Sequence, residues 1–204
     1  MSRIGLLGGA FNPPHAGHLR LAELGWRALS LAEVRFVPTA TSPHKPEPGG
    51  TPAPEARVRL LEEALRDLPF PVRVATLELA RGGISYTVDT LEALHEVEPG
   101  HQWILLLGSD QLALLPQWHR LDRILELAAL AVAPRPGAET QPQPEHAHRV
   151  CGHWSGAPGE IVWLPPTDLD LASSGIRTRL AVRQPGPGLP AAVEAAIMRE
   201  NLYR

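Results

Sequence analysis

The chain has 204 residues, of which 44% are hydrophobic, and a formal net charge of −3 at pH 7. This size favours one compact domain, and the near-neutral charge argues against a surface that binds nucleic acid through many phosphates. Cys151 is the only cysteine, so an intramolecular disulfide is excluded, and no apolar run forms a signal peptide or is long enough to cross a bilayer, so we expect a cytoplasmic protein without membrane partners.

Apolar runs of strand length alternate along the chain with stretches of helical periodicity, which is typical of a parallel sheet covered by helices. Strands are predicted at Ile4–Leu7, Val34–Val37, Val72–Leu77, Trp103–Leu107, Leu130–Ala133 and Ile161–Leu164. Helices are predicted at His18–Leu29, Glu55–Leu68, Thr87–Val97 and Leu121–Leu127, and near Ser174–Val182 and Pro190–Asn201. The expected fold is α/β, a doubly wound parallel sheet in a single domain over residues 1–204, which includes the C-terminal helices from about residue 173.

Two proline-rich and glycine-rich stretches, Thr39–Pro54 and Arg135–Gly159, are predicted to be loops because neither can hold a helix or a central strand. The second contains residues of metal-ligand type whose spacing matches no standard zinc site, and we expect solvated side chains rather than a metal site: His146, His148, Cys151 and His153. In an open parallel sheet, ligands bind beyond the carboxyl ends of the strands. The loops that follow the strands are therefore the candidate sites.

The segment Gly8–Leu19, GGAFNPPHAGHL, follows the first predicted strand and opens the first helix. Gly8 and Gly9 let the backbone approach a ligand closely, and a helix start offers unpaired N–H groups to phosphate oxygens. His15 and His18 can donate further hydrogen bonds and stabilise charge that develops during a phosphate transfer. A glycine-rich turn after a strand or a single histidine is also common in proteins that bind nothing at that turn. The spacing of the glycines does not fit the dinucleotide fingerprint G-x-G-x-x-G.

A second segment, Leu171–Arg177, reads LASSGIR and opens a predicted helix. Ser173 is expected to cap this helix, which leaves first-turn N–H groups for an anion. Arg177, about one turn into the helix, can form a bidentate contact with a β- or γ-phosphate. Taken alone, the segment is equally compatible with an ordinary helix cap and a solvated arginine.

Both segments resemble signatures of the H-x-G-H nucleotidyltransferase superfamily: the first G-G-[T/S]-F-D-P-x-H-x-G-H-L, the second I-S-S-T-x-I-R, which holds the ATP triphosphate. Four further blocks resemble those of the bacterial nicotinate-nucleotide adenylyltransferases, so that the resemblance covers nearly the whole chain: Pro38–Lys45, Ser85–Leu91, Leu107–Asp110 with Trp118, and Glu200–Arg204. The resemblance implies a Rossmann-like nucleotidyltransferase fold. It also implies that ATP and nicotinic acid mononucleotide react to give nicotinic acid adenine dinucleotide and pyrophosphate in NAD biosynthesis.

The resemblance carries a set of residue roles. It implies catalytic roles for His15, His18, Lys45 and Arg177. It implies ATP binding by Gly8, Gly9, Ala10, Phe11, His18, Gly108, Asp110, Ser173, Ser174, Ile176 and Arg177. It implies binding of the mononucleotide by His44, Lys45, Tyr86, Thr87, Trp118 and Arg135, with the carboxylate at Thr87 and the pyridine ring against Trp118. Mg²⁺ is expected to bind through the ATP phosphates, with no metal site made by the protein itself.

Several positions depart from the family pattern. Ala10 stands where Thr or Ser is usual and Asn12 replaces Asp, while Ala172 and Ser174 replace Ser and Thr, and His119 replaces an aromatic residue after the tryptophan. Rival interpretations are a sister adenylyltransferase for nicotinamide mononucleotide or phosphopantetheine, and a non-catalytic nucleotide-binding protein on the same scaffold. The oligomeric state stays open, with a homo-oligomer among the alternatives.

Overall fold

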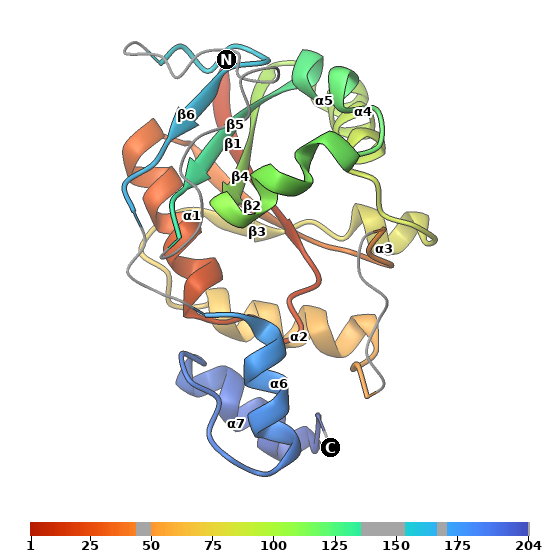
Figure 1. Cartoon of the computed structure of the whole chain (residues 1–204), viewed down its shortest axis with the longest axis vertical. Coiled ribbons are helices and arrows are strands. Elements are labelled where there is room, and N and C mark those ends of the chain that lie inside the picture. Colours follow the sequence, from red (N-terminus) through yellow and green to blue (C-terminus); the bar gives the residue numbers. More distant parts are fainter. Residues whose placement is uncertain (44–49, 136–153, 167–170, 204) are drawn as a thin grey trace.

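The computed structural model describes residues 1–43, 50–135, 154–166 and 171–203. Six parallel strands form one sheet in the order β3-β2-β1-β4-β5-β6. Their bounds are β1 Ser2–Gly9, β2 Glu33–Pro38, β3 Val72–Val74, β4 His101–Gly108, β5 Ala128–Ala133 and β6 Ile161–Trp163. Strand order reverses direction between β1 and β4, because the chain first builds outward from β1 to β3 and then returns to the other side of β1 (Figure 1).

Helices cover both faces of the sheet, as the alternation of strands and helices predicts. The helices are α1 Ala16–Leu29, α2 Pro54–Leu65, α3 Leu77–Arg81, α4 Thr87–Val97, α5 Leu121–Leu127, α6 Ser173–Ala181 and α7 Ala191–Glu200, with a 3₁₀ helix η1 at Ser109–Gln117. One apolar cluster packs α1 and α2 against strand residues such as Leu7 and Phe36, and another packs α4, α5 and η1 against residues such as Leu6 and Trp103. The predicted doubly wound α/β fold is therefore confirmed.

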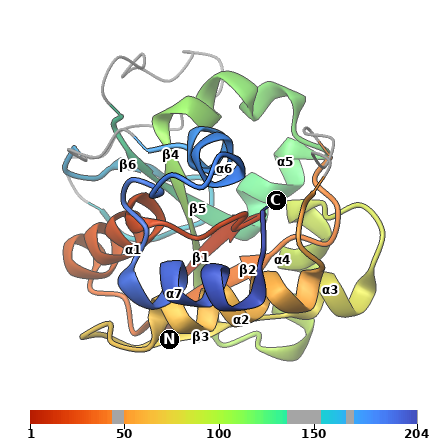
Figure 2. The ribbon, with the colours of Figure 1, turned by 90° about the horizontal axis from the view of Figure 1, so that it is seen from below.

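The C-terminal helices α6 and α7 lie beyond the carboxyl ends of the strands, and α7 runs beside α2 (Figures 1 and 2). They share a small apolar cluster with α2, called here the C-terminal cluster, in which Leu180 of α6 packs against Leu60, Ala64, Val193, Ala196, Ile197 and Tyr203. Within the described residues, no helix has the combination of length and apolarity that crossing a membrane requires.

Two parts of the predicted secondary structure were wrong. The strand predicted at Val72–Leu77 ends at Val74, and Leu77 instead opens α3. The amide of Ala75 still donates to the carbonyl of Phe36, but the next donor of this parallel ladder would be the amide of Pro38, which proline lacks. The 3₁₀ helix η1 was not predicted either, because Pro116 lies inside it and interrupts the helical pattern.

Candidate active site

A cavity of about 730 Å³ opens at the carboxyl ends of the central strands. Its walls come from the loops after β1, β2, β4 and β5, from the start of α4 and from the start of α6. Such a volume lies in the range of small-molecule sites, and its place beside the reversal of strand order is where open α/β sheets bind ligands.

Two histidines at the start of α1 form a hydrogen-bonded pair. His15 is the N-cap residue, and its Nδ1 accepts a hydrogen bond from the amide of Gly17 at 3.2 Å. The His15 amide in turn donates to Nδ1 of His18 at 3.2 Å. Because a backbone amide can only donate, both Nδ1 atoms lack a proton, and each neutral ring carries its proton on Nε2. Both side chains line the cavity and can offer it an Nε2–H donor.

The surroundings keep both rings neutral. Burial, with the nearby positive charge of Arg135, lowers the pKa of His15 from 6.5 to about 4. Burial also lowers the pKa of His18 well below its usual value, and His15 and Arg135 add to that effect. At neutral pH the loop therefore presents uncharged donors, which cost less to bury than imidazolium ions.

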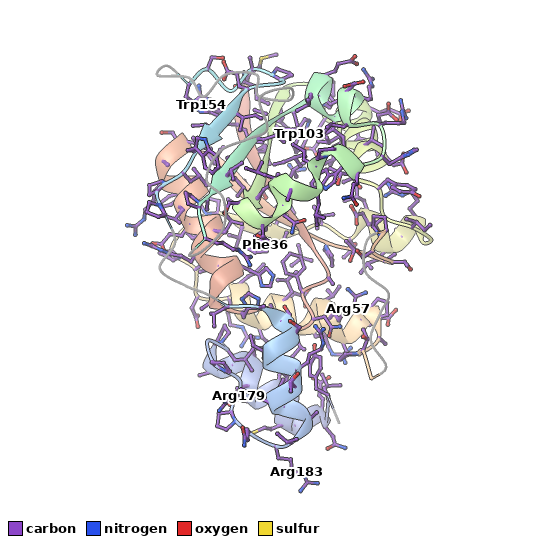
Figure 3. The ribbon with its side chains drawn as sticks, in the orientation of Figure 1. Phe36, Arg57, Trp103, Trp154, Arg179 and Arg183 are labelled. Carbon is purple, nitrogen blue, oxygen red and sulfur yellow. The ribbon has the colours of Figure 1, made fainter. Side chains whose placement is uncertain are left out.

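A buried arginine of α2 fixes the backbone of the loop after β1. Arg57 of α2 is only 1% exposed, and its guanidinium donates to the carbonyl of Ala10 at 2.7 Å and to that of Thr39 at 2.9 Å. Arg57, which Figure 3 labels, thus ties the loop after β1 to the loop after β2. Phe11, which has a left-handed φ of 45°, packs between Phe36 and His18, with ring centroids 5.8 and 5.0 Å away.

The start of α6 is bonded directly to the first loop. The Ser173 hydroxyl donates to the carbonyl of Pro13 at 3.2 Å, and the Arg177 guanidinium donates to the carbonyl of Asn12 at 2.7 Å. The predicted capping role of Ser173 is wrong: Ala172 is the N-cap residue and no side chain caps the helix. The reason is that Ser173 is already the first residue of α6 and its hydroxyl is bonded to the first loop instead, so the first-turn amides of α6 keep their capacity to bind an anion.

The other half of the cavity lies at the start of α4. Tyr86 is its N-cap residue and makes no side-chain cap, so the first-turn amides, including that of Thr87, remain available to an anion. The Tyr86 ring lies 4.5 Å from the ring of His119, and the partly buried Trp118 belongs to the same wall. An aromatic wall beside free helix amides suits a flat ring that carries a carboxylate.

Asp110 and Arg135 meet at the ends of β4 and β5. The Arg135 Nε lies 3.1 Å from Oδ1 of Asp110, and the Arg135 amide donates to the Ser109 hydroxyl at 2.9 Å. A β-carbon on Gly108 would lie 2.5 Å from the Asp110 carboxylate and 2.7 Å from the Arg135 guanidinium. Any other residue at this position would displace the ion pair from its present place.

The structure brings most of the predicted site residues to this one cavity. Those that line it are Gly8, Gly9, Ala10, Phe11, His15, His18, Tyr86, Thr87, Gly108, Asp110, Trp118, Arg135, Ser173, Ser174 and Arg177. Ile176 of α6 does not line it, and its side chain is buried. His44 and Lys45 lie outside the described residues, as does the loop cluster His146, His148, Cys151 and His153. Among the described residues, no group of three or more side chains could hold a metal ion.

Several polar residues of the cavity were missed, among them Arg57, Glu78 and Thr90. Two of them carry a signal in the sequence. Arg57 lies on the same helical face as Leu60, Leu61 and Ala64, and Thr90 on the same face as Leu91 and Leu94. A polar side chain on an apolar helical face must find buried partners, and this marks it as a candidate for the site.

Comparison with known proteins gives a consistent result. A family model described as cytidylyltransferase-like matches residues 6–179. The probable nicotinate-nucleotide adenylyltransferase of Shouchella clausii is 37% identical over 205 residues, covering 100% of this chain and 97% of that protein. That of Trichlorobacter lovleyi is 39% identical over 215 residues, covering 99% of each. The structure of Plasmodium falciparum nicotinic acid mononucleotide adenylyltransferase complexed with NaAD has a TM-score of 0.77 at 16% identity, covering 100% of this chain and 98% of that one.

Proposed function

Because the chain belongs to the nicotinate-nucleotide adenylyltransferases, within the cytidylyltransferase-like family, we propose that it joins the AMP part of ATP to nicotinic acid mononucleotide. The products are nicotinic acid adenine dinucleotide, a precursor of NAD, and pyrophosphate. The observation that carries the proposal is the direct bonding of two segments far apart in the chain: Arg177 to the carbonyl of Asn12, and Ser173 to that of Pro13. It joins the start of α6, which no side chain caps, to the loop that carries His15 and His18, at one cavity.

The reaction is an in-line displacement at the α-phosphorus of ATP by the phosphate of the mononucleotide. That phosphate is already ionised at neutral pH, so the protein has no proton to remove, and catalysis comes from positioning and charge stabilisation. The Nε2–H donors of His15 and His18 serve the phosphate oxygens whose charge grows as pyrophosphate leaves. Neutral donors in a buried site stabilise this charge without reorganising, since their tautomers are fixed beforehand.

The two substrates share the cavity. We assign the triphosphate to the start of α6 and to Arg177, with the ATP ribose at Asp110. The nicotinate carboxylate goes to the amides at Tyr86 and Thr87, with the pyridine ring against Trp118 and the mononucleotide phosphate within reach of Arg135. Mg²⁺ enters as MgATP, held by phosphate oxygens and water. A cytoplasmic location belongs to the same proposal.

The proposal is tested by pyrophosphate release from purified protein with MgATP and one acceptor at a time. We expect rapid release with nicotinic acid mononucleotide. Faster release with nicotinamide mononucleotide or with phosphopantetheine would show that the acceptor is assigned wrongly, while adenylyl transfer would stand. Absence of release with all three would overturn adenylyl transfer itself and favour a non-catalytic nucleotide-binding protein.

A further inference from the structure

Glu78 is a buried carboxyl at the cavity wall that belongs to neither sequence motif. It lies in the first turn of α3 and is the one buried residue of that short helix. Its side chain is 5% exposed and lines the cavity on the side of α4. A carboxyl in such a place requires a reason, because taking it out of water costs free energy unless its bonds serve a purpose.

The first bond of Glu78 is to α4. Its Oε1 accepts a hydrogen bond of 2.6 Å from the hydroxyl of Thr90, one turn into that helix. The Arg81 guanidinium donates to the same hydroxyl at 3.3 Å, so the Thr90 oxygen is used both as donor and as acceptor. This short chain of bonds connects α3 to the first turn of α4.

Ser85 lies beside the same carboxyl and is hydrogen-bonded to the loop after β2. Its amide donates to the carbonyl of Thr41 and its hydroxyl accepts from the amide of Ala40, both at 2.9 Å. The hydroxyl also lies close enough to Glu78 to favour the charged carboxylate, as do Thr90 and the positive charge of Arg81. The Glu78 carboxyl thus stands where α3, α4 and the loop after β2 meet.

The segment held by these bonds is the one that ends in Tyr86 and Thr87. Between Glu78 and Ser85 the chain turns through Gly82 and Gly83, which have φ values of 68° and 67°. Two adjacent glycines are conformationally permissive, so the turn does not fix the place where α4 begins. The hydrogen bond to Thr90, and the place of Ser85 beside the carboxyl, lie on either side of Tyr86 and Thr87 and supply the constraint that the turn lacks.

We propose that Glu78 is a positioning residue for the pyridine nucleotide: through Thr90 and Ser85 it sets the place of the Tyr86 and Thr87 amides that receive the carboxylate. This inference rests on the proposed function, because it concerns the mononucleotide end of the same cavity. It assigns Glu78 no contact with the ATP end, where the first loop and α6 lie.

The energetic cost of Glu78 supports a role in binding rather than in folding. Its Oε2 has no hydrogen-bond partner among the described residues, and burial raises the pKa of the carboxyl. Because its folded pKa lies above its unfolded value, the charged form lowers the free energy of unfolding at neutral pH. An uncharged side chain of equal size would serve stability better, so Glu78→Gln is expected to unfold at the same temperature as the wild type or higher.

The test is a comparison of Michaelis constants in the full-length protein, with each substrate varied while the other saturates. Thr90→Val removes the hydroxyl at nearly constant shape, and Thr90→Ser keeps it. We expect Thr90→Val and Glu78→Ala to raise the KM for nicotinic acid mononucleotide about tenfold, the equivalent of one misplaced hydrogen bond. In both variants the KM for ATP and kcat are expected to change less than about threefold.

Conservative variants supply the controls. Thr90→Ser and Glu78→Gln retain the oxygen that makes the bond and are expected to stay within about threefold of the wild type in both KM values. Glu96→Gln changes an exposed carboxylate on the same helix, α4, and is expected to have no effect.

The outcomes are distinct. Equal rises in both KM values, or Thr90→Val behaving like Thr90→Ser, would show that the bond does not position the mononucleotide. If the wild-type protein releases pyrophosphate but the variants do not differ in this way, this inference alone is overturned. A wild-type protein that releases no pyrophosphate overturns the proposed function and this inference with it.

Discussion

Replacing His18 with alanine is expected to lower kcat by about 10²–10³, because it removes one buried donor from the transition state. In free energy this is roughly 3–4 kcal/mol. The effect on folding is smaller. His18 Nδ1 accepts the His15 amide at 3.2 Å as part of the α1 cap, and losing one capping bond costs about 1 kcal/mol. For a chain of this size that shifts the unfolding temperature by about 2–4 °C.

The two magnitudes make the experiment decisive. Pyrophosphate release is followed at pH 7.5 with both substrates saturating, and thermal unfolding is measured on the same preparation. His101→Ala is a matched control, since that imidazole sits at the start of β4, at the opposite end of the sheet from the cavity. If His18→Ala keeps its kcat within about tenfold of the wild type, the transition-state role of this loop is wrong. If the unfolding temperature falls by much more than the cap explains, the kinetic loss reflects a damaged fold.

Three further results are expected. Arg177→Ala raises the KM for ATP more than that for the mononucleotide, and equal weakening of both substrates would make Arg177 structural. The kcat/KM for nicotinic acid mononucleotide exceeds that for nicotinamide mononucleotide by at least about 10²-fold with saturating MgATP. The reason is that the nicotinamide group presents an NH₂ donor to backbone N–H groups that also donate. Lowering the pH from 7.5 to 5 reduces the free energy of unfolding. The reason is that His15, whose pKa is about 4 in the folded protein and 6.5 in the unfolded chain, binds a proton in the unfolded chain first. His15→Gln is expected to lose about 2 kcal/mol of that pH dependence in urea unfolding, and an unchanged slope would contradict the neutral state of His15.

The fold could be predicted from the sequence where a local pattern determined it. The strand cores and the helices of both layers follow from apolar runs and helical periodicity, as at Leu130–Ala133 and Thr87–Val97. The strand after Leu68 was predicted too long because its end depends on Pro38, a residue of the neighbouring strand. Pairing across strands is not visible in the segment that is paired.

The candidate site was predictable as two motifs but not as one structure. The spacing of His15 and His18 suggested a phosphate loop, yet the protonation of each ring follows from amides that only the folded loop brings into place. Ser173 was assigned to its own helix because capping is a local rule, whereas in the structure its hydroxyl reaches Pro13, far away in the chain. Glu78 sits in a short helix that has no sequence periodicity to reveal which side is buried.

The small size of the C-terminal cluster affects which part of the protein opens locally. This cluster is much smaller than the two clusters that flank the sheet, so α6 and α7 can open together at a lower free energy than the sheet. A nucleotide that binds only the closed form holds them shut, and at 100 times its Kd it lowers the population of the open form about 100-fold. None of the residues of α7, all of which the structure describes, lines the cavity. Hydrogen–deuterium exchange at the amides of α7 therefore reports occupancy of a site that this helix never touches.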